Sequence, residues 1–305
     1  MKCILSLVAL VAACCACANA AKREVKTVRL LTVGNSFSGN ATSYLDELAA
    51  AAGHKLVLGR ADLGGCSLER HWKAVEADPK SDAGRPYTVR VGEANRQRSL
   101  EGILASEKWD FVTIQQYSLI SPDVTTYRPY ARNLFDFIKK HAPQAEVLIH
   151  ETWAYRRDDP GFESGASSQV RMYRDLSRAY RAIAKELGLS IIPVGDAFYA
   201  ADTDDTWRYR PAKLDQSALK HSDLPDQTHS LHVGWHWVKD DEGSHRLAMD
   251  GHHASAAGCY LAGCVWFEVL FNESVENNPF VPAGMLQADA AYLRSLAHRI
   301  ARTEL

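Results

Sequence analysis

Short apolar runs alternate with longer amphipathic segments along most of this chain, and this alternation restricts the folds that it can adopt. Residues 28–33 (VRLLTV) predict a β-strand, and residues 41–52 place leucines and alanines on one helical face. Segments of both kinds then follow in turn, at residues 111–114, 130–138, 147–149, 173–187 and 191–194. Repeated strand–helix units predict a central parallel sheet that is covered by helices on both faces.

Two segments interrupt the alternation. Residues 85–98 are polar without a clear period and predict a loop or a short hairpin. Residues 199–247 are rich in aromatic side chains and histidines, which is typical of an insertion that serves a site. Within them, residues 231–238 alternate Leu, Val and Trp with His and Gly, which predicts a strand that buries its apolar face. A final amphipathic helix is predicted at residues 283–302.

The composition favours one soluble globular domain. The 305 residues are 46% hydrophobic, and their 35 basic and 37 acidic side chains give a formal net charge of −2. Such a chain can bury a sizeable core, and its near-neutrality argues against nucleic acid as a partner. The sequence holds neither internal repeats nor linker-like tracts, so we expect a single domain over residues 21–305. It does not fix the oligomeric state.

The first 20 residues predict a secretory signal peptide. Lys2 precedes a largely apolar run of ten residues at positions 4–13, and residues 18–20 (ANA) match the small-residue pattern of a cleavage site. The apolar run would span only about half of a ~30 Å hydrocarbon layer, so we expect no transmembrane segment and a secreted or periplasmic protein. Alternatively, residues 11–14 (VAAC) resemble a bacterial lipoprotein box, which would leave the protein lipid-anchored at Cys14.

Cysteines do not form a framework in the remaining chain. Four of the seven lie within the first 17 residues, which leaves Cys66, Cys259 and Cys264. Three cysteines in so long a domain indicate that the hydrophobic core holds the fold. Cys259 and Cys264 are interpreted as small buried residues of one helix.

Ser36 is the first candidate for a chemical role. The residues Gly34-Asn35-Ser36 stand where the first predicted strand passes into the first predicted helix. In an open α/β sheet this position lies at the carboxyl end of a strand, where ligands bind, and a helix start offers N–H groups to an anion. A serine there can act as a nucleophile, although serine and asparagine are also ordinary helix caps.

Asp250 and His253 form the second candidate. They stand immediately before a helix that is predicted to start near Ser255. On one turn, the carboxylate can accept a hydrogen bond from one imidazole nitrogen while the other nitrogen faces the serine. Such residues are frequent in turns, but their order, after a serine on the first strand's turn, favours a catalytic set.

Five motifs together resemble the SGNH/GDSL hydrolase superfamily, and within it the DUF4886-type domain. They are GNSFSGN at 34–40, LGGCSL at 63–68, TIQQYS at 113–118, HETWAY at 150–155 and DGHHASAAGCYLAG at 250–263. The resemblance implies a flavodoxin-like three-layer α/β/α sandwich with a central parallel sheet, and the insertion would precede the last core helix. It also implies Ser36 as nucleophile, with Asp250 and His253 completing the triad. His253 occupies the family's D-x-x-H position, and His252 is interpreted as a neighbour that shapes the pocket.

The resemblance further implies an oxyanion hole. Its donors would be the backbone N–H of Ser36, that of Gly64 or Gly65, with Gly65 favoured, and a side-chain amide. The superfamily's usual G-x-N-D after the third strand is absent, and Gln115-Gln116 stands just upstream of that place. Losing one donor typically costs about 10²- to 10³-fold in kcat, so we expect a replacement, and Gln116 is favoured over Gln115.

The aromatic residues suggest a carbohydrate ester as the substrate, because exposed Trp and Tyr rings stack on sugar faces. Candidates in or near the insertion are Trp153, Tyr155, Trp207, Tyr209, Trp235 and Trp237. The expected substrate contacts are Asn35, which replaces the superfamily's usual Asp, and Trp153, Tyr155 and Trp235. The histidines at 229, 232 and 236 raise the idea of a metal site. However, only the last two would share a strand face and no carboxylate completes the set, so we predict no metal and no cofactor.

These expectations combine into an exported serine esterase that removes acetyl or other short acyl groups from carbohydrate esters through an acyl-enzyme. A non-catalytic glycan-binding protein on the same fold is one alternative. An O-acyltransferase is another, because transfer and hydrolysis use the same triad and differ only in which group attacks second.

Overall fold

The computed structural model describes residues 24–91, 94–162, 168–212 and 220–303. The predicted signal peptide, with Cys14, lies outside these residues. A five-stranded parallel sheet forms the centre of the fold, with the strand order β2-β1-β5-β6-β7. Its strands, in chain order, are β1 (Thr27–Gly34), β2 (Lys55–Asp62), β5 (Phe111–Ile114), β6 (Glu146–His150) and β7 (Ser190–Ile192).

Helices cover both faces of this sheet. One hydrophobic cluster contains Leu30 and helices α1 (Ser36–Ala41), α2 (Leu45–Ala51), α7 (Val194–Thr203), α8 (Ala256–Phe271) and α9 (Gln287–Ala301). The other contains Leu31 and helices α3 (Leu68–Glu76), α4 (Leu100–Leu104), α5 (Tyr130–His141) and α6 (Gln169–Leu187). Successive residues of a strand point to opposite faces, which is why Leu30 and Leu31 belong to different clusters.

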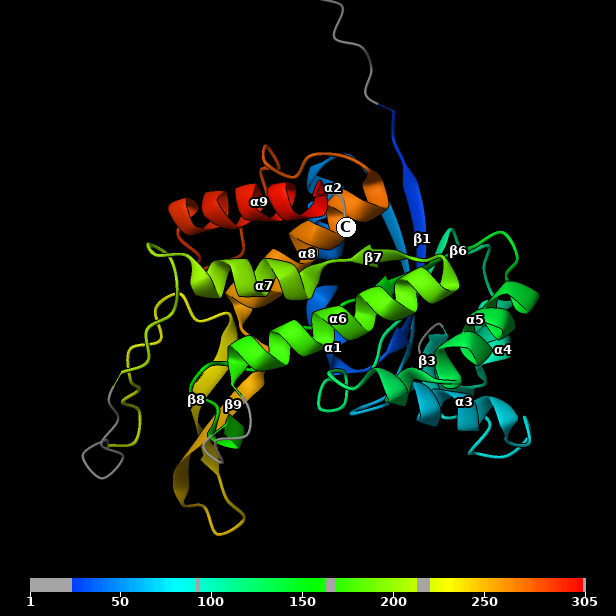
Figure 1. Cartoon of the computed structure of the whole chain (residues 1–305), viewed down its shortest axis with the longest axis horizontal. Helices are drawn as coiled ribbons and strands as arrows, with labels where there is room; N and C mark the ends of the chain where they lie inside the picture. The colour runs from blue at the N-terminus through cyan, green and yellow to red at the C-terminus, as the bar shows by residue number, and fades with distance from the viewer. Residues whose placement is uncertain (1–23, 92–93, 163–167, 213–219, 304–305) are drawn as a thin grey trace, which may run out of the picture.

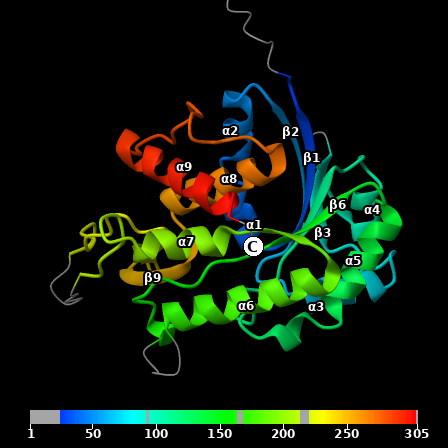
Figure 2. The same ribbon diagram turned by 45° about the horizontal axis from the view of Figure 1, so that its top comes forward.

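The predicted three-layer α/β/α fold is therefore confirmed. Figure 1 gives the arrangement of the elements, and Figure 2 separates α2, α8 and α9 on one side of β1 from α3, α4 and α5 on the other. Short 3₁₀ helices lie at Val124–Tyr127 and Pro160–Phe162. Cys66, Cys259 and Cys264 are buried and free, as expected. None of the described helices combines the length and the apolar character that a membrane span requires.

Several predicted boundaries differ from those in the structure. The helix expected over residues 41–52 is shorter and corresponds to α2, while a separate short helix, α1, precedes it. Between them, the Thr42 hydroxyl donates to the Ser38 carbonyl. The strand expected at residues 191–194 ends at Ile192, because Pro193 lacks the N–H that a ladder requires, and α7 follows at once. Residues 85–98 contain the hairpin β3 (Tyr87–Val91) and β4 (Ala94–Arg98), one of the two expected alternatives.

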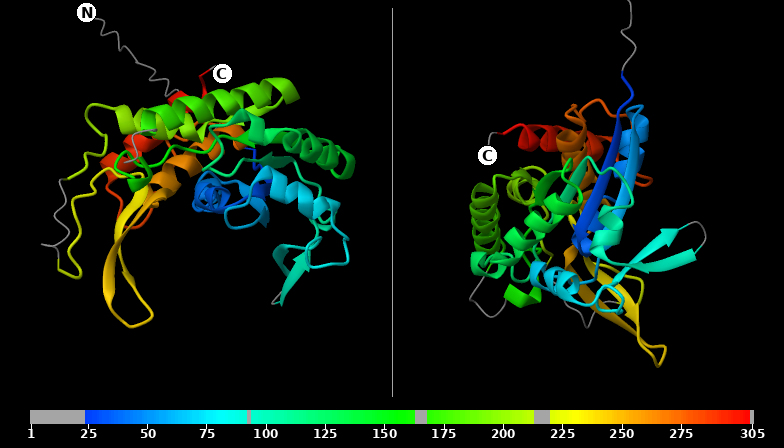
Figure 3. Two further views of the ribbon diagram at one scale, coloured as in Figure 1. Left: turned by 60° about the horizontal axis from the view of Figure 1, so that its bottom comes forward. Right: turned by 90° about the vertical axis from the view of Figure 1, so that its right-hand side faces the viewer.

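The insertion forms a second antiparallel hairpin, β8 (His232–Lys239) and β9 (His245–Ala254). It begins later than predicted, because residues 199–203 belong to α7. The expected burial is also inverted at the start of β8, where His232 is buried and Val233 is 37% exposed, since a register irregularity separates His232 from Gly234. Figure 3 (left) shows both hairpins projecting from the body on the same side of the molecule.

Candidate active site

Ser36 is the first residue of α1, directly after the end of β1. Asn35 caps this helix, because its Oδ1 accepts the N–H of Phe37 at 3.0 Å. The side chain of Ser36 stays partly accessible, while Asn35 and Phe37 on either side are buried. The chain therefore passes sharply from strand to helix and leaves the hydroxyl at the carboxyl edge of the sheet, with the first-turn N–H groups beside it.

The structure brings Ser36, His253 and Asp250 together. The Ser36 Oγ lies 2.9 Å from the His253 Nε2, and the His253 Nδ1 lies 2.8 Å from the Asp250 Oδ2. The other carboxylate oxygen accepts the backbone N–H groups of His252 and His253, at 3.2 and 2.9 Å. These bonds fold the end of β9 around the carboxylate, so the D-x-x-H set lies on a strand end rather than on a separate turn.

The environment keeps Asp250 ionised. Partial burial alone would raise the pKa of its carboxyl, but the hydrogen bonds from the side chain and the backbone of His253 outweigh it and lower the pKa below the usual range. An ionised carboxylate on the Nδ1 side fixes the imidazole tautomer and stabilises the imidazolium that forms when the Nε2 takes a proton. The arrangement can therefore activate the Ser36 hydroxyl as a nucleophile.

His252 contacts the same carboxylate. Its Nδ1 lies 3.1 Å from the Asp250 Oδ1, and its ring centroid lies 4.2 Å from that of His253. Burial, together with the neighbouring His253, lowers the pKa of His252 despite the opposing effect of Asp250, so this imidazole is neutral near pH 7. Within the described residues, Asp250, His252 and His253 are also the set whose ligand atoms come close enough to hold a metal ion together.

The three histidines at 229, 232 and 236 do not converge. His229 stacks on Trp207 at a centroid distance of 4.6 Å, and the buried His232 donates from its Nε2 to the Ala154 carbonyl at 3.0 Å. His236 contacts the Gly234 carbonyl on its own strand. Each ring therefore has a separate structural contact.

The turn at residues 63–66 lies beside the nucleophile. The Leu63 N–H donates to the Gly34 carbonyl at 3.0 Å, and the Asn35 Nδ2 donates to the Cys66 carbonyl at 3.0 Å. Gly65 has a φ of 56°, a left-handed conformation that favours glycine, and it is exposed. These contacts tie the turn to Gly34 and Asn35, and the backbone N–H groups of Ser36 and Gly65 stay the predicted oxyanion donors.

Neither glutamine supplies the expected third donor. The Gln116 Nε2 donates to the backbone and the hydroxyl of Thr126, and its Oε1 accepts the N–H groups of Leu68 and Tyr117. The Gln115 Nε2 donates to the Asn35 Oδ1 at 2.8 Å. Because both amides are buried and occupied in the framework, the assignment of Gln116 to the oxyanion hole is wrong for this arrangement.

The expected substrate contacts divide into buried and accessible residues. Asn35 and Trp153 are buried, and Trp153 stacks between Phe37 and Phe198 while its Nε1 donates to the His252 carbonyl at 2.8 Å. Both therefore support the site from within and do not meet the expectation of substrate contact. Tyr155 and Trp235 are half-buried. Of the other predicted aromatic residues, Trp207 and Tyr209 are buried and Trp237 is half-buried.

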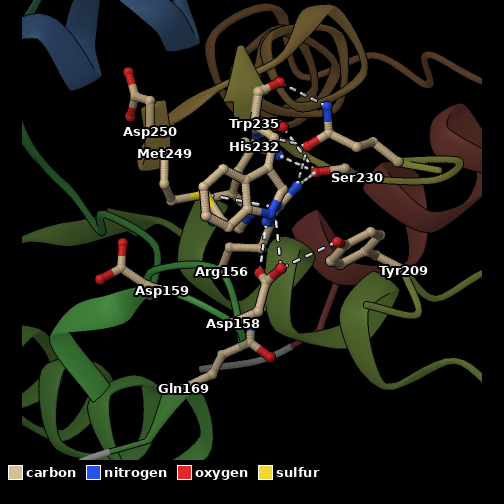
Figure 4. A network of polar contacts seen from close by, with 12 residues as sticks. Arg156, Asp158, Asp159, Gln169, Tyr209, Ser230, His232, Trp235, Met249 and Asp250 are labelled. Atoms are coloured by element: carbon tan, nitrogen blue, oxygen red, sulfur yellow. Dashed lines mark hydrogen bonds and ion pairs between the residues drawn. The ribbon is translucent and has the colours of Figure 1, made fainter. Parts of the chain in front are cut away.

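Sequence reasoning missed Arg156, which lies on the loop after β6 and is 1% exposed. Its backbone N–H donates to the Gly251 carbonyl at 2.7 Å, and its guanidinium stacks over the Tyr209 ring at 4.4 Å. Figure 4 shows the guanidinium among the side chains of Asp158, Ser230 and Met249. The guanidinium also donates to the Gln227 Oε1 at 2.7 Å. Arg156 thus contacts the residues immediately before and after Asp250. Its partners lie far apart in sequence, so no local pattern indicates them.

Comparisons with known proteins agree with this fold. The family model "Domain of unknown function (DUF4886)" matches residues 29–209. A crystal structure of a DUF4886 family protein from Bacteroides uniformis ATCC 8492 is 28% identical, with a TM-score of 0.69, and the match covers 90% of this chain and 94% of that chain. No curated protein matches the sequence.

Two further solved structures are more distant. A candidate SGNH hydrolase from Slackia heliotrinireducens is 23% identical, with a TM-score of 0.49, over 79% of this chain and 98% of that chain. A variant of an acetyl-xylooligosaccharide esterase from Geobacillus Stearmophilus is 14% identical, with a TM-score of 0.42, over 80% of this chain and 94% of that chain.

Proposed function

We propose that this chain, which belongs to the DUF4886 family, is a serine ester hydrolase of the SGNH type. The observation that supports this proposal most strongly is the continuous pair of short contacts from Ser36 through His253 to Asp250. The turn that holds Gly65 lies beside the same serine, so donors for a developing oxyanion accompany the nucleophile.

The reaction follows from these groups. The Ser36 Oγ attacks the ester carbonyl carbon as its proton passes to the His253 Nε2, and the backbone N–H groups of Ser36 and Gly65 receive the oxyanion. Collapse of the tetrahedral intermediate breaks the ester C–O bond, and His253 returns the proton to the leaving alcohol. A water then attacks the acyl-enzyme with His253 again as base, which releases the carboxylic acid and restores Ser36. Asp250 remains ionised throughout.

We assign the substrate to short acyl esters of carbohydrates. The half-buried ring of Tyr155 lies 5.5 Å from the His252 ring. Tyrosine rings offer an apolar face and a polar edge, as sugars do. The proposal includes export, because residues 1–20 have the pattern of a signal peptide, with a lipid anchor at Cys14 as the alternative. The mass of the protein recovered from its native host distinguishes these two forms.

The direct test is the Ser36→Ala variant, measured with acetylated xylooligosaccharides and with a fluorophosphonate probe. We expect hydrolysis to fall by about 10⁴- to 10⁶-fold and labelling to disappear, since the nucleophile is lost while the fold is kept. Ser43→Ala is the matched control, because Ser43 is an exposed serine close to the same helix. Parental activity in Ser36→Ala would refute the assignment, and transfer of acetyl groups to added sugar in place of water would identify an acyltransferase.

A further inference from the structure

A series of aromatic rings, each in contact with the next, begins at Ser36 and consists of His253, His252 and Tyr155. His253 contacts Ser36, and its ring lies 4.2 Å from that of His252. The His252 ring in turn lies 5.5 Å from the Tyr155 ring at an angle of 46°. The line of contacts therefore leads from His253 to the half-buried Tyr155 ring, which also packs against both hydrophobic clusters.

A second set of contacts connects Tyr155 to the turn of Gly65, next to Ser36. The Tyr155 hydroxyl shares a hydrogen bond with the Ser118 Oγ at 3.1 Å, and Ser118 directly follows Tyr117. The Tyr117 ring lies 3.8 Å from the position that a Cβ on Gly65 would occupy. Since the turn of Gly65 is tied to Gly34 and Asn35, these contacts form a circuit that connects Tyr155 back to the residues just before Ser36.

Three rings of this circuit, those of Tyr117, Tyr155 and His252, are partly accessible and uncharged, whereas Ser118 is buried. Tyr117 and Tyr155 are half-buried, and the His252 side chain is 41% exposed. Burial raises the pKa of Tyr155 and lowers that of His252, so both remain neutral near pH 7. The titratable groups that act on His252 are Asp250, His253 and Asp159. Asp250 and His253 bind each other, which leaves the Asp159 carboxylate near Gly251 as an acceptor for hydroxyl groups and as a repellent for anions.

We propose that Tyr117, Tyr155 and His252 form a subsite that holds the uncharged sugar ring whose hydroxyl carries the acyl group. This inference rests on the proposed function and adds its specificity-determining residues. The two phenol rings offer stacking surfaces, and the imidazole and the hydroxyls offer neutral hydrogen-bonding groups. The acyl group then faces Ser36 and the Gly65 turn, while the sugar, which is the alcohol portion of the ester, contacts Tyr117, Tyr155 and His252.

The test compares two substrates in the same variants, an acetylated methyl xyloside and ethyl acetate, which has no ring to hold. In Tyr117→Ala and Tyr155→Ala, we expect the ratio of kcat/KM for the sugar ester to that for ethyl acetate to fall about 10-fold, mostly through KM. Tyr117→Phe and Tyr155→Phe keep the rings and should remain within about 3-fold of the parent ratio. Tyr199→Ala is the matched control, because this half-buried tyrosine stacks on Tyr173, away from the circuit.

The outcomes separate the subsite from the reaction. An unchanged ratio in both alanine variants of an active enzyme overturns the subsite and leaves the esterase assignment intact. A preference for an acetylated uronide over the neutral sugar also overturns it. If the parent hydrolyses no ester, binding of the xyloside to Ser36→Ala is measured by ligand-observed NMR. Binding that Tyr117→Ala abolishes then supports the subsite alone, and absence of binding overturns both proposals.

Discussion

The nucleophile and its base are held in place by different kinds of contact. The nucleophile segment, residues 34–41, rests on neutral buried groups: the His71 Nε2 donates to the Gly34 carbonyl at 3.0 Å, and Gln115 donates to Asn35. The base segment, residues 249–254, rests on the buried charge of Arg156 and its partner Asp158. One segment belongs to the sheet and the other to an insertion. Uncharged groups therefore hold the first segment, whereas a buried ion pair holds the second.

The largest effect should come from Arg156→Met, which removes the charge from the base segment. Asp158 then loses its partner in a largely buried place, and we expect the free energy of unfolding to fall by about 3 to 5 kcal/mol. Chemical denaturation measures this change. Arg128→Met is the control, because the ion pair of Arg128 with Glu186 is exposed and contributes at most about 1 kcal/mol. Equal free energies of unfolding in the two variants would show that the buried Arg156–Asp158 pair stabilises the base segment no more than an exposed pair does.

Acid should weaken both segments, since a buried neutral histidine contacts each. Burial lowers the pKa of His71 to about 4 and that of His232 to about 3. Below the ordinary pKa of about 6.5, the unfolded chain binds protons that the folded chain does not. The contribution of each histidine to stability therefore rises with pH between about 4 and 6.5 and is lost as the pH falls through that window. The carboxyls of Asp62 and Asp202, whose pKa values burial raises to about 6 and about 7, contribute in the opposite direction. Each histidine should account for about 2 kcal/mol between pH 6.5 and 5.

Melting temperatures between pH 4.5 and 7.5 measure this slope, and His71→Gln tests the part that belongs to the nucleophile segment. Glutamine can still donate to the Gly34 carbonyl but does not titrate. The number of protons that the chain takes up on unfolding, which sets the slope of stability against pH, should therefore decrease by about one. His221→Gln is the control, because His221 is exposed. A slope that His71→Gln leaves unchanged would show that His71 is protonated in the folded protein.

The smallest effect is expected for Asn35→Asp, which restores the superfamily's usual residue. The Asn35 Nδ2 donates to the Cys66 carbonyl, and a carboxylate oxygen would repel that carbonyl. A negative charge at the start of α1 offsets part of this loss, so we expect a net destabilisation of about 1 kcal/mol. kcat should also fall, because the turn of Gly65 is held less firmly. Asn95→Asp, on an exposed strand, should change neither quantity, and an unaltered Asn35→Asp would show that the Cys66 contact is dispensable.

The sequence predicts the layers and the central residues of the site because both depend on local patterns. Ser36 follows a strand, and Asp250 and His253 are three residues apart, so a short motif and its place in the order of elements are sufficient. Gln116 could not be assigned in this way, because the choice between the oxyanion hole and Thr126 depends on which groups compete for its amide.

Two other errors have the same origin in tertiary contacts. The position of Trp153 after a strand is compatible with an exposed ring, but in the structure Phe37 and Phe198 stack on its two faces. The burial of β8 is inverted at its start because an irregularity in pairing separates His232 from Gly234. A Cβ on Gly234 would collide with Arg156 and Gln227, so this irregularity is coupled to a cluster that only the folded chain assembles.

The β8–β9 hairpin has an anchored inner end and an exposed outer end. The inner residues 249–254 are fixed by the loop after β6, whereas residues 240–245 at the tip are exposed. Length or sequence can therefore change at the tip over evolutionary time without moving Asp250 or His253. The surface of the tip can thus differ between relatives that keep the same arrangement of Asp250 and His253.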